Sequence, residues 1–390
     1  MDLNWLKASF VPPAQSTMAA LSDGSPASDM ETQNSPFVSI IIPTFNGGSK
    51  LEATLGTCLK IKGVELEILL IDDASTDGTP DRIERNYPMV KLFRLPTNSG
   101  SGANGRNVGL AMARGSYVKF LDHDDLIQPR GFRVECQEAL KSNADIVMSR
   151  WGVAHINERG LFRKQDLRIF TPPEPSRLLE AILLGESTPY TAAALYKRSL
   201  VCHELWDANQ SLIDDFDWFC RMALKDCKVT RVDSISYFWR LHSDSTQGRS
   251  HHQATIYQEL MFERYNVFVK LEAQLATRHL LTKDNRQLLA KRYYESLRCF
   301  ARFRHRACLE VLRKIYRLDP GFQVEASCEP EPWARWLIRC VGLLVFLRLY
   351  GGWRRLGDAA HPIRGRTRRF LRPRLAATLR RPEVRAGDKE

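Results

Sequence analysis

The chain has 390 residues, 44% of them apolar, and a formal net charge of +12. This length allows two domains, or one large domain with extensions. The charge is uneven: residues 331–390 hold 15 basic against 5 acidic residues, so the first 330 residues carry a net charge of only +2. A nucleic-acid-binding body carries its cationic face on the folded domain, and the nearly neutral body therefore argues against nucleic acid as a partner.

The nine cysteines form no C-x-x-C pair and are odd in number. Neither a zinc site nor a disulfide framework is indicated, and reduced thiols in a cytosol are the simpler interpretation. No charged-then-apolar stretch typical of a secretory signal opens the sequence. We therefore expect the protein to work in the cytoplasm.

A strand–helix–strand rhythm follows residues 1–35, which are rich in polar residues and predict a disordered lead-in. The apolar run 37–42 predicts a buried strand that ends at Pro43. A helical stretch over 51–59 and a second buried strand over 66–71 come next. This order favours a parallel sheet with right-handed crossovers.

The second strand ends in the carboxylates Asp72 and Asp73. Ligands of open α/β sheets bind beyond the carboxyl ends of the strands, so we assign Asp73 to a ligand. Asp77 precedes a helical segment and is assigned to helix capping. A strand over 90–95 then leads into a glycine-rich loop before a helix at 108–113.

Arg106 stands at the end of that loop, where a planar donor can pair with a base or a phosphate. The loop itself fits neither a P-loop nor a Rossmann fingerprint.

The stretch Tyr117-Val-Lys-Phe-Leu-Asp122-His-Asp124-Asp125 predicts a short buried strand that delivers carboxylates to one point. Asp122 and Asp124 are two residues apart, so both would point to the same side of extended backbone. Such a pair repels unless a cation sits between its members, and a hard divalent cation prefers oxygen ligands. The alternative is an acidic loop that caps the following helix.

Four segments in order now resemble a family 2 glycosyltransferase of the GT-A fold, over roughly residues 37–245: Ser39-Ile-Ile-Ile-Pro-Thr-Phe-Asn46, Ile71-Asp-Asp-Ala-Ser-Thr-Asp-Gly-Thr79, Arg106-Asn-Val-Gly109 and Phe120-Leu-Asp-His-Asp-Asp125. The resemblance implies an α/β fold with a mainly parallel, Rossmann-like central sheet flanked by helices. It implies a catalytic domain over 36–250, with a nucleotide-sugar half at 36–128 and an acceptor half at 129–250.

By position, the resemblance also implies a nucleoside diphosphate-sugar donor and the side chains that hold it. Asp122 would face the ribose and Asp124 the metal, while Asp125 extends the motif or fixes its loop. The remaining nucleotide-binding positions are Pro43, Thr44, Asn46, Asp73 and Arg106.

The acceptor half continues the resemblance with segments 145–149, 190–198 and 211–221. Asp215 falls at the position of the catalytic base, and a base is needed because a sugar hydroxyl is a poor nucleophile. Asp214 stands where the family has Glu, and with Trp218 it is assigned to the acceptor. The alternative for Asp214 and Asp215 is N-capping of the helix.

Segment 238–246 ends the resemblance with Arg240 and His242. The match implies that Arg240 supports the diphosphate region and that His242 completes the metal shell. The expected metal ligands are Asp122, Asp124 and His242, around Mg²⁺ or Mn²⁺. A lone histidine is otherwise usually a packed or capping residue.

The last part of the chain predicts helices over 251–330 and a basic amphipathic tail over 331–390. The apolar run Cys340–Leu347 is too short to span a bilayer, which needs about 20 apolar residues. With Trp and Arg around it, the tail is expected to lie on an anionic membrane surface. The alternative is a helix docked on the catalytic domain.

The predicted function is inverting transfer of a sugar from a UDP- or dTDP-linked donor to a glycan or glycolipid hydroxyl. The predicted place is the inner face of the plasma membrane. A non-catalytic nucleotide-sugar-binding relative is the alternative, and the intact Asp124 and Asp215 favour the enzyme. A nucleotidyltransferase does not explain the segments around Asp215 and His242.

Overall fold

The computed structural model describes residues 37–155, 167–186, 190–210, 212–242, 254–302 and 307–324, and positions 334, 338, 343 and 345. The predicted lead-in and nearly all of the predicted tail lie outside these residues. The chain divides into two compact units, residues 1–299 with 309–323 and residues 300–308 with 324–390. In the second unit, Ala334, Ile338 and Leu343 are helical and buried, whereas Val345 is helical and exposed.

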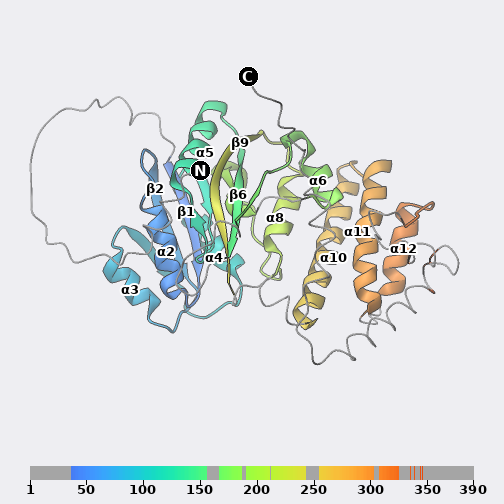
Figure 1. Ribbon diagram of the computed structural model, residues 1–390, viewed down its shortest axis with the longest axis horizontal. Coiled ribbons are helices and arrows are strands. Elements are labelled where there is room, and N and C mark those ends of the chain that lie inside the picture. The colour runs from blue at the N-terminus through green and yellow to red at the C-terminus, as the bar shows by residue number, and fades with distance from the viewer. Residues whose placement is uncertain are drawn as a thin grey trace, which may run out of the picture. The chain divides into compact units, whose positions relative to one another are not determined.

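One mixed β-sheet forms the centre of the first unit (Figure 1). Its strand order is β3-β2-β1-β4-β8-β6-β9-β5, with β7 paired to β6. The strands are β1 (Phe37–Thr44), β2 (Glu65–Asp72), β3 (Val90–Arg94), β4 (Tyr117–Phe120), β5 (Leu126–Ile127), β6 (Ile146–His155), β7 (Arg168–Phe170), β8 (Ala194–Lys197) and β9 (Val229–Leu241).

Strands β1 to β4 are parallel to one another, as the strand–helix–strand rhythm predicts. The crossovers are the helices α2 (Gly48–Cys58), α3 (Thr79–Asn86) and α4 (Gly102–Met112). Val38, Ile40, Ile41 and Ile42 of β1 are fully buried, which explains why its sequence lacks polar alternation.

Helix α4 begins six residues earlier than the sequence predicts, inside the expected glycine-rich loop. Ser101 caps it by accepting a hydrogen bond from the Ala103 amide at 3.2 Å. The glycines of this segment serve packing: a Cβ on Gly105 would lie 2.8 Å from Pro43, and one on Gly109 would lie 2.3 Å from Ile41. Glycine at these two positions lets α4 approach β1 closely.

The other half of the sheet is mixed. Strand β8 runs antiparallel to both β4 and β6, while β6 is parallel to β9, and β5 pairs antiparallel with β9. The helices of this half are α5 (Pro129–Ser142), α6 (Leu178–Leu184), α7 (Arg198–Val201) and α8 (Asp214–Met222), with 3-10 turns at Pro175–Arg177 and Thr191–Ala193.

An ion pair lies in the core between the two halves. Lys119 of β4 and Glu135 of α5 are both 0% exposed, and Lys119 Nζ donates to Glu135 Oε2 at 2.6 Å. Lys119 also donates to the Ser236 hydroxyl of β9 at 3.3 Å. The pair therefore joins three elements in the buried interior.

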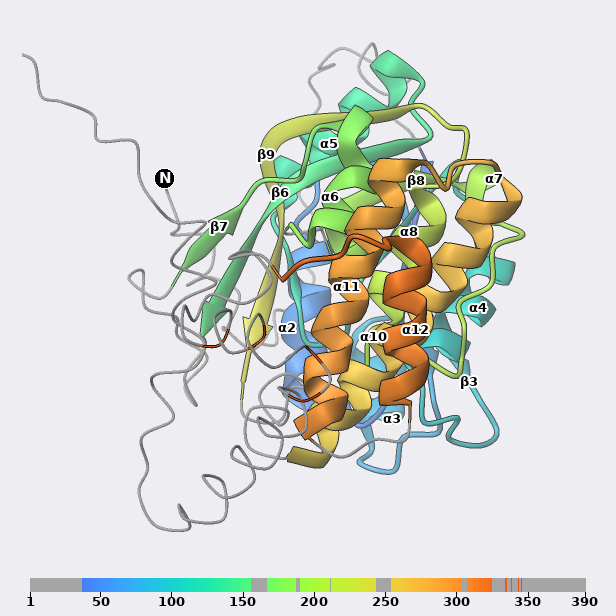
Figure 2. The same ribbon diagram turned by 90° about the vertical axis from the view of Figure 1, so that its right-hand side faces the viewer.

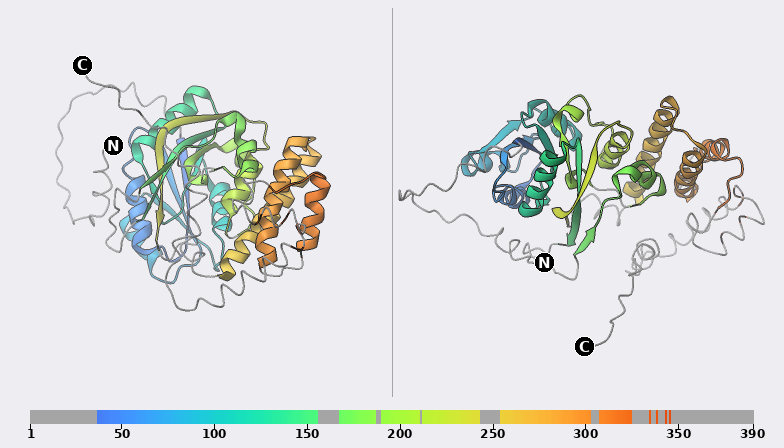
Figure 3. Two further views of the ribbon diagram at one scale, coloured as in Figure 1. Left: turned by 45° about the vertical axis from the view of Figure 1, so that its right-hand side comes forward. Right: turned by 90° about the horizontal axis from the view of Figure 1, so that it is seen from above.

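Three helices follow the sheet, α10 (Ala254–Thr277), α11 (Lys283–Arg302) and α12 (Cys308–Leu318), and Figure 2 shows them side by side. Both views in Figure 3 place them on the α8 side of the sheet. The Phe216 ring of α8 meets Phe268 of α10 at a centroid distance of 5.5 Å, and Glu263 accepts from the Leu212 amide at 3.0 Å. The predicted C-terminal helical extension is confirmed.

No helix within the described residues is both long and apolar enough to cross a membrane.

Candidate functional site

The carboxyl ends of β1, β2 and β4 meet at one edge of the sheet. The Asp73 amide donates to the Thr44 carbonyl at 2.8 Å, and the Leu121 amide donates to the Ile41 carbonyl at 3.0 Å. Because β1 is parallel to both β2 and β4, these carboxyl ends lie side by side. Because ligands of such sheets bind beyond the strand ends, this edge is the candidate site.

Two of the predicted nucleotide ligands hold the loops around this edge. Asp73 accepts hydrogen bonds from the Ser99 amide (2.9 Å) and hydroxyl (3.0 Å). Asn46 has a left-handed backbone (φ 50°), and its Oδ1 accepts from the Thr76 amide at 2.9 Å.

The Thr44 hydroxyl is buried at the end of β1, next to Pro43. In the part of the chain that the structure describes, it has no hydrogen-bond partner. A buried polar group without a partner is uncommon, so this hydroxyl is suited to a ligand. Asp77 accepts a hydrogen bond from the Thr79 amide, in the first turn of α3, at 2.9 Å. The cap residue of α3 is Gly78, however, so the assignment of Asp77 as the cap is wrong.

The segment after β4 is a turn and is not extended. The Asp125 amide donates to the Asp122 carbonyl at 3.1 Å, so the chain reverses between them. Asp122 accepts from Arg106 at 2.5 Å, whereas Asp124 pairs with His242 at 2.8 Å. The prediction that both carboxylates share one side of a strand is therefore wrong, because the turn gives each its own partner.

Asp124 and His242 form a pair at the candidate site. Lys50 Nζ lies 3.3 Å from His242 Nδ1, and His242 Nε2 lies 2.8 Å from Asp124 Oδ2. Burial opposes the charge of Asp124, but the His242 contact and nearby positive side chains lower its pKa to about 2. Asp124 is therefore ionised at neutral pH.

Arg240 holds the backbone on both sides of the Asp124–His242 pair. Its guanidinium donates to the Asp124 carbonyl, to the Lys50 carbonyl at 2.8 Å and to the Thr54 hydroxyl at 3.1 Å. Lys50 and Thr54 are four residues apart on α2, and no motif marks them in the sequence. Arg240 thus fixes backbone and is itself buried.

Asp125 fixes the turn, the alternative expected for it. It is 1% exposed, and it accepts hydrogen bonds from the Tyr237 hydroxyl and the Arg240 amide. Burial and the charge of Asp124 raise the pKa of Asp125 well above its ordinary value.

Asp215 lies on the acceptor side, at the start of α8. Its Oδ1 accepts from the Thr191 hydroxyl at 2.5 Å. Burial and the negative charge of Asp214 raise the pKa of Asp215 to about 7. The cap residue of α8 is Ile213, with no side-chain cap bond, so N-capping does not explain Asp214 and Asp215.

Arg106 lies on α4, and its side chain points into the interior. It is 5% exposed and donates to Asp122 and to Asp214, each at 2.5 Å. Burial opposes its charge, yet these carboxylates raise the pKa of Arg106 above its ordinary value. The expectation of an arginine on a loop at the mouth of the site is wrong, because the helix begins earlier.

Trp218 belongs to the core. It is 0% exposed, stacks on Trp206 at a centroid distance of 4.4 Å and meets Phe120 edge-on at 5.3 Å. Its ring has no surface for an acceptor in this structure, so the assignment of Trp218 to acceptor binding is corrected to core packing.

The expected three-residue metal set is not assembled. Within the described ranges, no group of three or more His, Cys, Asp or Glu side chains could hold a metal ion. Asp122 is engaged by Arg106, which leaves Asp124 with His242. Mg²⁺ is commonly held by one or two carboxylates and substrate phosphates, so this pair fits a metal bound mainly through a phosphate ligand.

Comparison with known proteins agrees with this geometry. Residues 39–203 match the model of glycosyl transferase family 2. The chain is 32% identical over 170 residues to the poly(ribitol-phosphate) β-N-acetylglucosaminyltransferase TarP of Staphylococcus aureus, which is 42% of this chain and 50% of TarP. It is 30% identical over 149 residues to the succinoglycan biosynthesis protein ExoO of Rhizobium meliloti, 38% of this chain and 41% of ExoO.

Among solved structures, TarS 1-349 of S. aureus in complex with UDP-GlcNAc superposes with a TM-score of 0.55 at 20% identity, over 83% of this chain and 92% of that one. This confirms the predicted GT-A fold. The chain spans about half the length of the first curated relatives that it matches. The match to the glycosyl transferase family 2 model covers residues 39–203, less than half of the chain.

Proposed function

We propose that the protein transfers a sugar from a nucleoside diphosphate-sugar to a hydroxyl of a glycan acceptor, with inversion at the anomeric carbon. The observation that carries the proposal is the position of Asp215. Asp215 is a half-buried residue, and the pKa of its carboxyl group is raised to about 7 in the same cluster as the donor-side Asp122. A general base works best with a pKa near the operating pH.

The donor is proposed to lie over the ends of β1, β2 and β4. Thr44, Asn46 and Asp73 would hold the base, beside Pro43, and Asp122 would face the ribose. A UDP-linked sugar is favoured over dTDP because TarS was solved with UDP-GlcNAc and TarP is named for N-acetylglucosaminyl transfer.

In the proposed reaction, Asp215 takes the proton of the acceptor hydroxyl as its oxygen attacks the anomeric carbon. The bond from that carbon to the diphosphate oxygen breaks, and the nucleoside diphosphate leaves with the electron pair. Asp124 and His242 would hold Mg²⁺ or Mn²⁺, which would neutralise charge on the departing diphosphate. Arg240 keeps the backbone of Asp124 in place.

Calorimetry with UDP, dTDP and GDP, each with and without Mn²⁺, tests the donor site. We expect UDP to bind best and EDTA to weaken its binding. Release of UDP from UDP-GlcNAc, first with water and then with poly(ribitol phosphate) as acceptor, tests turnover. UDP binding without any UDP release would favour the alternative, a non-catalytic nucleotide-sugar-binding protein.

The tail supports a proposal on location. Residues 331–390 carry a net charge of +10 beside a short apolar run. Basic residues near an anionic membrane contribute about 1 kcal/mol each, and buried Trp and Leu side chains add to this. We therefore propose peripheral binding to the inner face of the plasma membrane, with a lipid-linked acceptor.

Flotation with anionic liposomes tests that location. The whole chain should float and salt should reduce flotation, whereas protein ending at Pro330 should stay at the bottom. Flotation of both would show that the tail is not the anchor.

A further inference from the structure

Arg106 joins the two halves of the candidate site. Its Nη2 donates to Asp122 Oδ1, in the turn after β4, at 2.5 Å. Its Nη1 donates to Asp214 Oδ2, at the start of α8, also at 2.5 Å. One planar guanidinium therefore links the nucleotide-sugar half, which contains Asp122, to the acceptor half, which contains Asp214.

The link continues to the proposed base. Asp214 uses its second oxygen, Oδ1, to accept a hydrogen bond from the Asp215 amide at 3.0 Å. Thr191 holds the Asp215 side chain from the other direction. The backbone of Asp215 is thus fixed by a carboxylate that is itself fixed by Arg106.

Residues of α4 also help to hold the Arg106 side chain in place. The Arg106 guanidinium lies over the Trp206 ring, 4.5 Å from its centroid. Asn107, the next residue of α4, holds the Trp206 backbone by donating to its carbonyl at 3.0 Å and accepting from its amide at 2.7 Å. A Cβ on Gly102 would lie 3.1 Å from Arg106 Nη1. A buried, stacked and doubly bound side chain has little freedom to turn toward a nucleotide.

We propose that Arg106 is a positioning residue that holds the ribose-side Asp122 and, through Asp214, the base Asp215 in one fixed arrangement, without binding the nucleotide itself. This inference rests on the proposed function. Three carboxylates, Asp122, Asp214 and Asp215, surround the guanidinium and would repel one another without it. A lysine keeps the charge but cannot present two donors in a rigid plane.

The test is Arg106→Lys, measured as the rate of UDP release from UDP-GlcNAc and as the UDP affinity by calorimetry. A misplaced catalytic group can cost about 10²-fold, so we expect the rate to fall by that order while the UDP affinity changes by less than about threefold. The opposite pattern, an unchanged rate with weakened UDP binding, would overturn the proposal and make Arg106 a nucleotide ligand.

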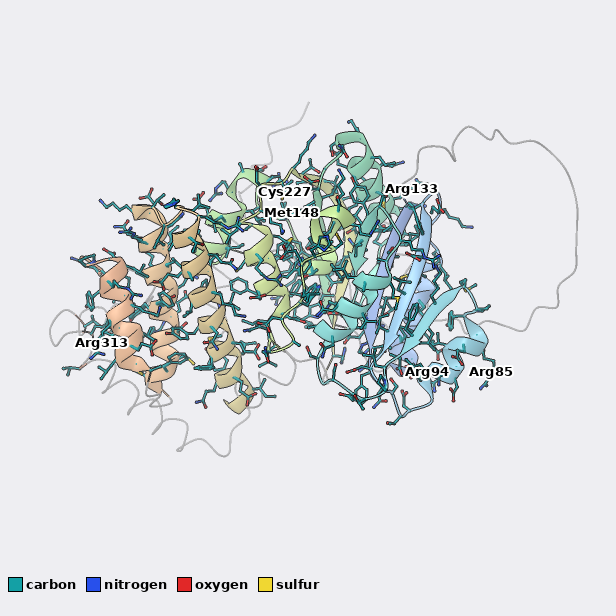
Figure 4. The ribbon with its side chains drawn as sticks, turned by 180° about the vertical axis from the view of Figure 1, so that it is seen from behind. Arg85, Arg94, Arg133, Met148, Cys227 and Arg313 are labelled. Carbon is teal, nitrogen blue, oxygen red and sulfur yellow. The ribbon has the colours of Figure 1, made fainter. Side chains whose placement is uncertain are left out.

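Arg94→Lys is the matched control. Arg94 also contacts two carboxylates, Asp81 at 2.8 Å and Glu84 at 2.9 Å, but it is exposed on the β3 side of the sheet (Figure 4). Its variant should release UDP at the wild-type rate. An equal loss in both variants would show a general effect of replacing a paired arginine, and would also overturn the proposal.

Asp214→Asn provides a second route, which also serves if Arg106→Lys does not fold. With water as the acceptor, a role of Asp214 in glycan binding is removed from the assay, so a slower UDP release reports positioning. The double variant should be no slower than the slower single variant, because both break the same link. Losses that multiply in the double variant contradict the link.

A wild-type protein that releases no UDP overturns the proposed function together with this inference. An active wild type with a fully active Arg106→Lys variant overturns only the positioning role.

Discussion

Two Asp-Asp doublets serve the site, and their surroundings give them opposite acid–base character. In Asp124-Asp125, the contact with His242 outweighs burial and lowers the pKa of Asp124 to about 2. In Asp214-Asp215, burial and the neighbouring carboxylate outweigh Arg106 and raise the pKa of Asp215 to about 7. Burial and charged neighbours therefore leave Asp124 ionised at neutral pH, whereas they give Asp215 a pKa near neutrality.

The largest effect is expected at the acceptor-side doublet. Asp215→Asn removes the proton acceptor but keeps the side-chain shape, and loss of a general base typically costs about 10²–10⁴-fold in rate. We expect UDP release to fall by this amount, with UDP affinity unchanged in calorimetry. Asp233→Asn, at an exposed carboxylate of β9, is the control and should stay active. Full activity of Asp215→Asn would show that Asp215 is not the general base.

Substitutions at Asp124 in the donor-side doublet, Asp124-Asp125, or at its partner His242 should weaken the binding of UDP. Asp124→Asn removes the ionised oxygen, and His242→Gln removes its partner; changes next to a metal ligand typically cost about 10–100-fold in metal affinity. We expect UDP titrations in Mn²⁺ to show weaker binding, and EDTA to make little further difference. Variants that bind UDP with wild-type affinity and remain sensitive to EDTA would assign the metal to other residues.

The raised pKa of Asp215 predicts a pH dependence. The base must be ionised, so UDP release should rise with pH up to about 7, losing about tenfold per unit below that value. Thr191→Val removes a hydrogen bond that lowers this pKa, so the midpoint should move to higher pH. A midpoint that stays in place would separate Thr191 from the titration of the base.

The titration of Asp215 should also affect stability, but in the opposite direction to activity as the pH rises. Between about pH 4 and pH 7 the folded state keeps a proton on Asp215 that the unfolded state has lost, so its contribution to stability falls as pH rises. Asp215→Asn should therefore raise the melting temperature more at pH 8 than at pH 5. Equal gains at both pH values would mean that Asp215 titrates normally.

The smallest effect is expected at Asp125. Its pKa is raised, and its two contacts fix backbone and a tyrosine, so the neutral Asn can replace it with a loss of about 1 kcal/mol or less. Thermal unfolding and UDP affinity in Mn²⁺ measure this. A loss in Asp125→Asn as large as in Asp124→Asn would remove the distinction within the donor-side doublet.

The sequence predicts the donor edge well because that edge follows from local patterns. Buried β-branched runs predict β1 and β2, and the parallel-sheet rule then places Asp73 beside Thr44. The start of α4 was mispredicted because glycines suggest a loop. Here Gly105 and Gly109 permit close packing on β1, a reason that exists only in the folded protein.

The contacts that tune the site depend on distant parts of the chain. Arg106 and Asp214 are 108 residues apart in sequence, and Lys50 and His242 are 192 apart. Neither pair has a local signal, so Lys50 was missed. Thr191 and Trp206 were missed as well, because their partners Asp215 and Asn107 are 24 and 99 residues away. Trp218 was misassigned because an aromatic beside a catalytic motif looks the same in sequence whether it faces a ligand or the core.

The buried pair of Lys119 and Glu135 constrains how this sequence can change over evolutionary time. Loss of either residue alone leaves an unpaired buried charge and typically costs about 3–5 kcal/mol, a large part of the roughly 5–15 kcal/mol by which native proteins are stable. Replacement of both by apolar residues of similar volume is often neutral. The two sequences are thus separated by strongly destabilised single variants, and the pair can persist by inheritance even if it contributes nothing to stability.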